Sequence, residues 1–180
     1  MACAFAFLEQ SDVTGITDSK KLTATKRDLI FSKLCELRDK KFVNWALISF
    51  SPEAIDKHGV QRVNTHALNL AAAQLIKKMG LPQNIVLIAD GNFRLADVVV
   101  DETKYPIESM IKADQKIQEV GAASIIAKVI RDKYMVSLHK LYPQYDWISN
   151  KGYLTEIHRQ AISKFGLSKF HRKTFCSNLI

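Results

Sequence analysis

Short apolar runs of strand length recur along the chain and are separated by longer stretches with helical spacing. The run 85–89 is almost entirely apolar and follows the chain-breaking sequence Leu-Pro-Gln-Asn, which is typical of a strand buried on both faces. Further strands are predicted at 3–8, 42–50 and 107–111. Strands that alternate with helices predict an α/β domain, a mixed sheet with helices on its faces.

The stretches between these runs carry helix start and stop signals. Thr23, Ser51 and Thr155 are capping residues that each precede a helical pattern. Helices are therefore predicted at about 24–40, 52–58, 64–79 and 156–165, with a further long one after Asp114 that ends before Pro143. The inward side of the first helix is predicted to be Leu29, Ile30, Leu34 and Leu37. Small residues dominate one face of the long helix, which lets it lie close to the sheet: Ala123, Ser124 and Ala127.

Two carboxylates stand at the ends of predicted strands. Asp90 follows the run 85–89, and Asp114 follows the run 107–111 and precedes the long helix. Open α/β sheets bind ligands beyond the carboxyl ends of their strands, and Mg²⁺ takes carboxylate oxygens that it shares with substrate phosphates. The pair therefore indicates a divalent-cation site. The spacing alone leaves open the alternative of a turn aspartate and a helix cap.

Composition adds a polyanionic partner to this picture. The formal net charge is +8 with a pI near 9.4, which favours nucleic acid over a small acid. The segment 151–180 carries six basic residues and one acid, with aromatic and histidine residues between them. This pattern predicts a contact surface, whereas the alternative is a solvated charged face. With 180 residues, 47% of them hydrophobic, we expect one domain, 1–180, whose helical, basic segment at about 145–180 contacts the partner.

Cysteine usage and hydropathy bear on the compartment. Three cysteines are odd in number and widely spaced, which suits a reducing cytoplasm. No apolar run approaches the ~20 residues of a membrane span. Residues 1–8 lack the basic start and the small-residue cleavage pattern of a signal peptide. We expect a cytoplasmic monomer without membrane contact.

Several motifs together resemble the ribonuclease HII family, the type 2 ribonucleases H. They occur in the family's order and approximate spacing: DSKKL (18–22), IADGN (88–92), KAD (112–114), AASIIAKVIRD (122–132), NKGYLTEIH (150–158) and FHRKTF (170–175). The resemblance implies a ribonuclease H-like fold and an endonuclease that depends on Mg²⁺ or Mn²⁺. Such an enzyme cuts the RNA strand of RNA/DNA hybrids, including single ribonucleotides embedded in DNA, and serves DNA replication and repair.

The resemblance also implies roles for individual residues. Asp90 and Asp114 match the third and fourth members of the family's catalytic, metal-binding acidic quartet. Tyr153 matches the tyrosine that packs at the junction between ribonucleotide and deoxyribonucleotide, although a tyrosine there can equally pack on the domain. The basic residues expected to contact nucleic acid are Lys20, Lys21, Lys151, Arg172 and Lys173.

The chain departs from the family pattern at its start. Family members begin with a strand that carries an adjacent Asp-Glu pair and then a loop with an arginine between two glycines. Here the first apolar run, 3–8, matches the family's second strand. No motif gives a reason to assign the role of the missing acids to Glu9, Asp12 or Asp18. Two carboxylates are few for a pair of metal ions ~3.5 to 4 Å apart. Three hypotheses follow: a ribonuclease HII impaired by this loss, an inactive hybrid-binding remnant, or a structural protein with a decayed site.

Overall fold

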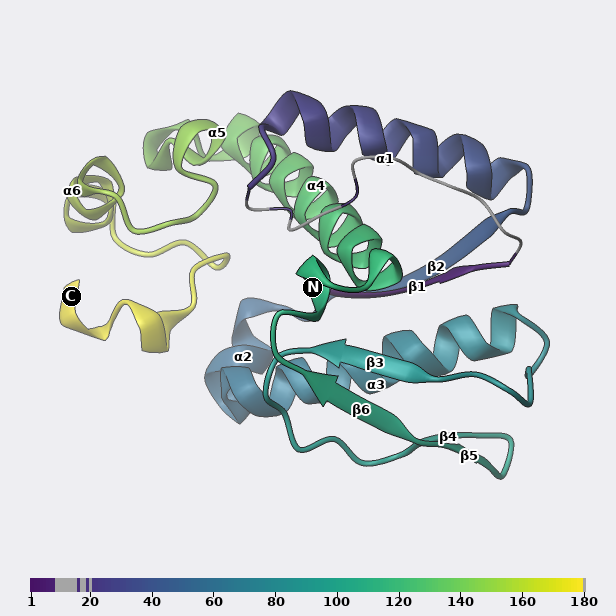
Figure 1. Ribbon diagram of the computed structural model, residues 1–180. Helices are drawn as coiled ribbons and strands as arrows, with labels where there is room; N and C mark the ends of the chain where they lie inside the picture. Colours follow the sequence, from purple (N-terminus) through teal and green to yellow (C-terminus); the bar gives the residue numbers. More distant parts are fainter. Residues whose placement is uncertain (9–15, 17–18, 20, 180) are drawn as a thin grey trace. The chain divides into compact units, whose positions relative to one another are not determined.

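The computed structural model describes residues 1–8, 16, 19 and 21–179 (Figure 1). Strands and helices alternate as predicted, which confirms the α/β class. The main elements are β1 (Ala2–Phe7), α1 (Ala24–Asp39), β2 (Val43–Ile48), α2 (Pro52–His58), α3 (Val60–Lys78), β3 (Leu87–Asp90), β4 (Val98–Val100), β5 (Thr103–Tyr105), β6 (Ile107–Met110), α4 (Gln118–Leu141), α5 (Trp147–Asn150) and α6 (Glu156–Phe165).

The chain divides into two compact units. The first, here called the sheet unit, comprises residues 1–49 and 64–129, and the second, the C-terminal unit, comprises 50–63 and 130–180. Helix α4 begins in one unit and ends in the other. The expectation of a single domain stays a prediction.

The strands of the sheet unit form pairs. β1 runs antiparallel to β2, with Ala2 opposite Ile48, and β3 runs parallel to β6, with Asp90 opposite Met110. The parallel pair brings the carboxyl ends of β3 and β6 to the same edge, where the candidate acids follow. β4 and β5 form an antiparallel hairpin, which the sequence patterns did not predict.

That hairpin turns through two residues in the left-handed region, Asp101 with φ 45° and Glu102 with φ 68°. Both central residues having positive φ is the signature of a type I′ turn, which usually contains asparagine or glycine. This is the one adjacent Asp-Glu pair in the sequence. Asp101 forms an ion pair with Lys77 (Nζ to Oδ1, 3.0 Å) on α3.

The predicted caps are confirmed as hydrogen bonds. The hydroxyl of Thr23 accepts from the Lys26 N–H at 3.2 Å, that of Ser51 from Ala54 at 3.3 Å, and that of Thr155 from His158 at 3.3 Å. Helix α3 begins earlier than the predicted residue 64, because the Gly59 carbonyl already accepts from the Val63 N–H at 3.1 Å. Gly59, with φ 81°, thus ends α2 and starts α3.

One predicted core position on α1 is wrong. Leu34 and Leu37 are buried, but the side chain of Leu29 is 67% exposed. Successive residues lie about 100° apart around a helix. The buried stripe passes through Ile30, which is partly buried, and this places Leu29 on the solvent side.

Each unit has its own apolar cluster. In the sheet unit, α3 packs against the hairpin through Ala72, Ile76, Val98, Val100 and Tyr105. In the C-terminal unit the cluster consists of Leu138, Tyr145, Trp147, Ala161, Ile162 and Cys176. No helix in the described part of the chain is long and apolar enough to cross a membrane.

Candidate functional site

The structure brings the two predicted acids together. Asp90 is the last residue of β3, and the chain leaving β6 enters a 3-10 turn at Ala113–Gln115 that contains Asp114. The Ala113 backbone N–H donates to Oδ1 of Asp90 at 2.9 Å. Asp90 is therefore fixed against the residue that immediately precedes Asp114.

The turn after Asp90 is held on both sides. The Gly91 N–H donates to the Met110 carbonyl at 3.1 Å, and the Phe93 N–H donates to the hydroxyl of Ser109 at 3.2 Å. Gly91 has φ 130°, and a Cβ at this position would collide with the ring of Phe93. Glycine is required here, so the chain turns sharply and leaves the Asp90 carboxylate at the sheet edge.

The two carboxylates differ in exposure. Asp90 is exposed, whereas Asp114 is only 6% exposed. Their oxygens are the ligand type that Mg²⁺ and Mn²⁺ prefer. Two such carboxylates would leave the other positions of an ion to water and phosphate. In the described residues, no group of three or more histidine, cysteine or acidic side chains is arranged to hold a metal ion.

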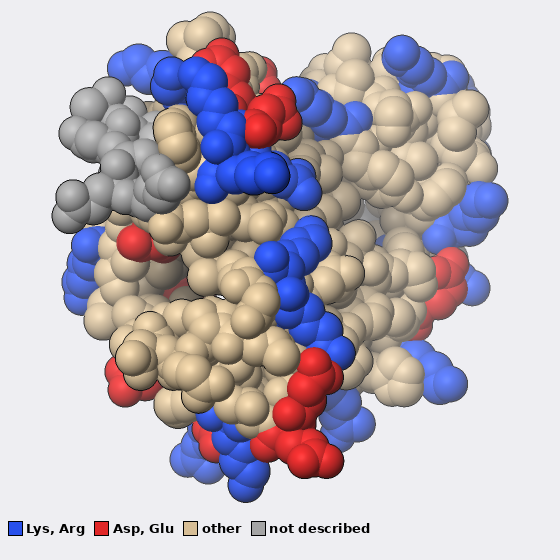
Figure 2. All heavy atoms as spheres, turned by 90° about the vertical axis from the view of Figure 1, so that its right-hand side faces the viewer, with Lys and Arg blue, Asp and Glu red and all other residues tan. Residues whose placement is uncertain are grey.

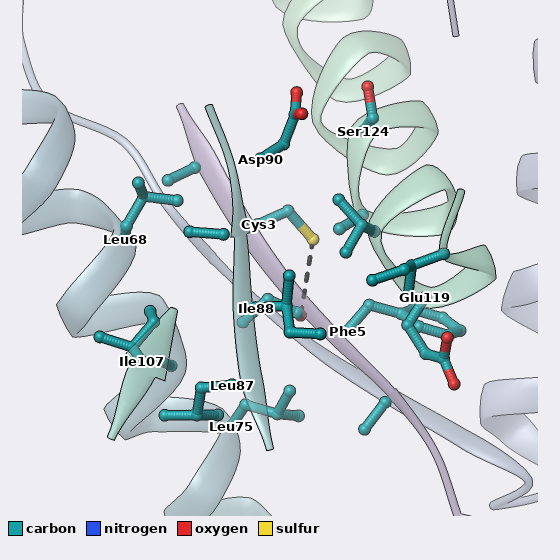
Figure 3. A pocket seen from close by; sticks show the side chains of 18 of the residues that line it. Cys3, Phe5, Leu68, Leu75, Leu87, Ile88, Asp90, Ile107, Glu119 and Ser124 are labelled. Atoms are coloured by element: carbon teal, nitrogen blue, oxygen red, sulfur yellow. Dashed lines mark hydrogen bonds between the residues drawn. The ribbon is translucent and has the colours of Figure 1, made fainter. Parts of the chain in front are cut away.

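A cavity of about 580 Å³ lies beside this acid pair within the sheet unit (Figure 3). Strands β1 and β3 both line it, helices α3 and α4 close its sides, and Asp90 stands at one end. Among the described residues β1 pairs only with β2 and β3 only with β6. The cavity therefore lies between two strands that each have one hydrogen-bonding edge outside any sheet.

The small face of α4 lines this cavity. Ala123, Ser124 and Ala127, which the sequence suggested lie close on a sheet, are only partly buried and face the open space. The buried hydrophobic residues of α4 within the sheet unit are Ala122, Ile125, Ile126 and Val129.

Part of the motif 18–22 is anchored beside the acids. The hydroxyls of Ser19 and Ser124 are 2.9 Å apart, and the Arg27 guanidinium donates to the Ser19 carbonyl at 2.9 Å. The Lys21 ammonium donates to Oε1 of Gln115 at 3.5 Å, next to Asp114. Lys20 lies outside the described residues, as do Glu9, Asp12 and Asp18.

Lys151 and Tyr153 share a turn in the C-terminal unit. Lys151 has φ 51° and Gly152 φ 79°, and the Gly152 N–H donates to Oδ1 of buried Asn150 at 2.8 Å. The Arg131 guanidinium donates to the Lys151 carbonyl at 3.0 Å and lies 5.0 Å from the Tyr153 ring centroid. The Lys151 ammonium donates to the Ile148 carbonyl. Tyr153 is 59% exposed, so most of its surface faces solvent.

The segment with Arg172 and Lys173 is held by an acid from α2. Asp56 accepts from the backbone N–H groups of Lys173 at 2.8 Å and Thr174 at 3.0 Å, and from the Thr174 hydroxyl at 2.6 Å. Desolvation raises the pKa of Asp56, but these hydrogen bonds outweigh it and leave that pKa below its usual value. The Arg172 guanidinium lies 3.8 Å from the Phe175 ring centroid, and the Lys173 side chain is exposed.

Two of the histidines that lie between the basic residues in the sequence are core residues. His158 and His171 are 3% and 7% exposed, because they pack among Tyr145 and Trp147 rather than beside the lysines. The charge asymmetry remains without them. The C-terminal unit has eleven basic and five acidic residues, a net charge of +6. The sheet unit has fifteen basic and thirteen acidic residues, a net charge of +2. On the face drawn in Figure 2, basic and acidic side chains are interspersed.

Comparison with known proteins identifies the family. The sequence model of ribonuclease HII matches residues 1–178. The chain belongs to the ribonuclease HII family. Ribonuclease HII from Pelagibacter ubique strain HTCC1062 is 42% identical over 174 residues, which is 97% of this chain and 86% of the relative. The enzyme from Campylobacter concisus strain 13826 is 39% identical over 165 residues, 92% of this chain and 79% of the relative.

Solved structures support the same fold. The structure of the PCNA:RNase HII complex from Archaeoglobus fulgidus matches with a TM-score of 0.66 at 22% identity, over 97% of this chain and 86% of that chain. Ribonuclease H2 from Pyrococcus horikoshii OT3 matches with a TM-score of 0.62 at 23% identity, over 89% and 76%. As a ribonuclease HII, this chain is of the ribonuclease H type, an endoribonuclease and hydrolase. The resemblance drawn from the six motifs is confirmed.

Proposed function

We propose that this ribonuclease HII uses Mg²⁺ or Mn²⁺ to cut the RNA strand of RNA/DNA hybrids, including single ribonucleotides embedded in DNA. The observation that carries the proposal is the hydrogen bond from the Ala113 N–H to Asp90 Oδ1, 2.9 Å long. It ties Asp90 to the residue that precedes Asp114. These two acids match the third and fourth of the family pattern and are separated by 24 positions in sequence. Two aspartates close together can contribute ligands to the metal ion that a phosphodiester hydrolase uses.

Asp90 and Asp114 would hold the metal ion in this proposal. When bound, the ion activates water and stabilises the leaving oxygen. Asp90, being exposed, is the carboxylate open to solvent and substrate, whereas buried Asp114 is fixed by the 3-10 turn. Lys21 beside Gln115 places a positive charge where a substrate phosphate would approach. Lys151, Arg172 and Lys173 supply further charge, and Tyr153 supplies an exposed aromatic face.

The cavity has room for a further strand between β1 and β3, and we propose that such a strand would complete the acidic site. Figure 1 shows β1 and β3 running in opposite directions. An added strand parallel to β3 would therefore be antiparallel to β1 and could pair with both. Helices α3 and α4 close both sides, so such a strand must be apolar or small on both faces. Its carboxyl end would lie next to Asp90, and carboxylates there would extend the acid pair to the number that two metal ions need.

The first experiment measures cleavage. The protein is incubated with Mg²⁺ or Mn²⁺ and each of three duplexes: an RNA/DNA hybrid, DNA with one ribonucleotide, and all-DNA. We expect slow cleavage of the first two and none of the third. Asp90→Asn should abolish it, whereas Asp28→Asn, the same change at an exposed position of α1, should not. Equal activity of Asp90→Asn and the unchanged protein would refute the assignment.

The second experiment adds the strand. A strand of the family pattern with its adjacent Asp-Glu pair is fused before Met1, and a matched fusion carries Asn-Gln in place of Asp-Glu. Both fusions should raise the melting temperature, because both fill the cavity, but only the acidic one should raise the cleavage rate. Equal rates for the two fusions would contradict the proposal that the added strand supplies metal ligands.

A hybrid-binding protein without activity is the second candidate. It is favoured by the finding that the described residues contain no group of three metal-ligating side chains, together with the net charge of +6 on the C-terminal unit. Salt-dependent binding of hybrid without cleavage, in both fusions as well as the unchanged chain, would decide in its favour.

A further inference from the structure

A buried chain of hydrogen bonds runs through the C-terminal unit to the carbonyl of Tyr153. Nδ1 of His158 is 3.0 Å from the Tyr153 carbonyl oxygen, and Nε2 of His158 is 3.1 Å from Nε2 of His171. The indole N–H of Trp147 also donates to His158 Nε2 at 3.3 Å. Trp147 and both histidines are at most 7% exposed.

The partners fix the proton positions on both rings. A carbonyl oxygen only accepts, so His158 carries its proton on Nδ1 and its Nε2 is bare. A backbone N–H only donates, and that of Ser168 lies 3.0 Å from His171 Nδ1. His171 is therefore bare at Nδ1 and protonated at Nε2, from which it donates to His158. With both rings neutral and in opposite tautomers, each ring nitrogen faces a suitable partner, and the single lone pair of His158 Nε2 is shared between the His171 and Trp147 donors.

The far end of this chain holds the Tyr153 turn. The Tyr153 carbonyl accepts from His158 and also from the Thr155 N–H at 2.9 Å, while the Tyr153 N–H donates to the Asn150 carbonyl at 2.9 Å. The backbone of Tyr153 is thus bonded on both sides. Its ring stays 59% exposed, beside the Arg131 guanidinium. These hydrogen bonds restrain the backbone from which the exposed ring extends.

We propose that His158 is a positioning residue that holds Tyr153 through its Nδ1–H, and that His171 and Trp147 keep His158 in the tautomer that can do so. The inference rests on the proposed role of Tyr153 at the ribonucleotide junction. It assigns a specificity function to two histidines that touch no substrate.

The surroundings favour the neutral pair. Tyr145 packs against both rings, and it belongs to an apolar cluster that includes Trp147 and Cys176. Burial, and then the neighbouring His158, lower the pKa of His171 to about 4. A proton added at His158 Nε2 would face two donors, so protonation breaks the chain.

Two substitutions at His158 separate its two nitrogens. The side-chain nitrogen of asparagine is as many bonds from Cβ as Nδ1, so His158→Asn keeps a donor for Tyr153. The amide of glutamine reaches the place of Nε2 instead, so His158→Gln loses that donor. Both remove the ring and should lower the melting temperature. His58→Gln, at an exposed position, is the matched control.

The readout is the ratio of affinities for a duplex with one embedded ribonucleotide and for the all-DNA duplex. His158→Gln should lower this ratio about fivefold, the factor for one ordinary hydrogen bond, and His158→Asn and His58→Gln should keep it. Equal losses in the Asn and Gln variants, or no loss in either, would overturn the proposal.

Nitrogen-15 spectra of the imidazole rings test the tautomers without nucleic acid. We expect the proton on Nδ1 of His158 and on Nε2 of His171 at pH 7, and the reverse assignment would overturn the proposal. Tyr153→Ala distinguishes the proposed role of Tyr153 in recognition from the proposed role of His158 in holding it. If it leaves the affinity ratio unchanged while the tautomers are as assigned, the recognition role of Tyr153 fails and the hydrogen-bonded chain holds only the fold.

Discussion

Acidification should destabilise the protein through His171. The pKa of this ring is lowered from its ordinary 6.5 to about 4, so below pH 6.5 the unfolded chain binds a proton that the folded chain resists. The stability contributed by the neutral ring is complete above pH ~6.5, declines as the pH falls towards 4, and is lost below it. At ~1.4 kcal/mol per pH unit the loss is about 3 kcal/mol. The free energy of unfolding of a typical domain is roughly 5–15 kcal/mol, so this loss is a large part of it.

Urea unfolding at a series of pH values between 7 and 4 measures this loss. Fluorescence of Trp147, which is 1% exposed, reports on the C-terminal unit once Trp45 of the sheet unit has been replaced by Phe. His171→Asn is the reference, because its amide oxygen can accept the Ser168 N–H but cannot titrate. Carboxylates shared by both proteins cancel in the difference. The difference in unfolding free energy should shrink by about 3 kcal/mol from pH 7 to 4. A difference that does not change with pH would refute the reasoning.

Further predictions concern partners, metal and backbone. Replacing Lys169, Arg172 and Lys173 by Gln should reduce the slope of log affinity against log salt by up to ~2.7, which titrations at several salt concentrations measure; an unchanged slope would move the contact surface elsewhere. Calorimetry should show Mg²⁺ binding weaker than micromolar, because Asp90 and Asp114 belong to no larger ligand group within the described residues. Asp90→Asn should remove this binding. Tight binding by the unchanged protein would mean that the metal site is more complete. Gly152→Ala should lower stability by ~1 kcal/mol or more in urea unfolding, because φ is 79° and the new Cβ would lie 3.0 Å from Met135 Cε; an unchanged midpoint would contradict this.

Local signals predicted the elements and the acid pair well. Thr23, Ser51 and Thr155 act through their own neighbours in sequence, so their caps could be read directly. The meeting of Asp90 and Asp114 followed from strand ends at one sheet edge, although their different exposures did not. What these residues do in catalysis stays a prediction.

The features that could not be predicted from the sequence depend on packing between residues far apart in the chain. His158 and His171 lie among basic residues in sequence, but Tyr145 and Trp147 enclose them in space. The β4–β5 turn was not predicted, because Asp101 and Glu102 occupy the two central positions where asparagine or glycine is usual. The cavity could not be predicted either. A helix face of small residues has the same sequence pattern whether it packs on a sheet or lines a cavity.

The cavity wall has a consequence for oxidation chemistry. Cys3 lines the cavity, and its thiol donates to the Ala4 carbonyl at 3.6 Å. Burial raises the pKa of Cys3 to about 12, against the smaller opposing influence of Arg38 and Lys78. Because of this raised pKa, Cys3 keeps its proton at neutral pH, and the thiolate is the form that peroxides and alkylating reagents attack. Slow oxidation and slow alkylation of Cys3 are therefore expected, and a faster rate of alkylation would report a change that exposes this cavity wall.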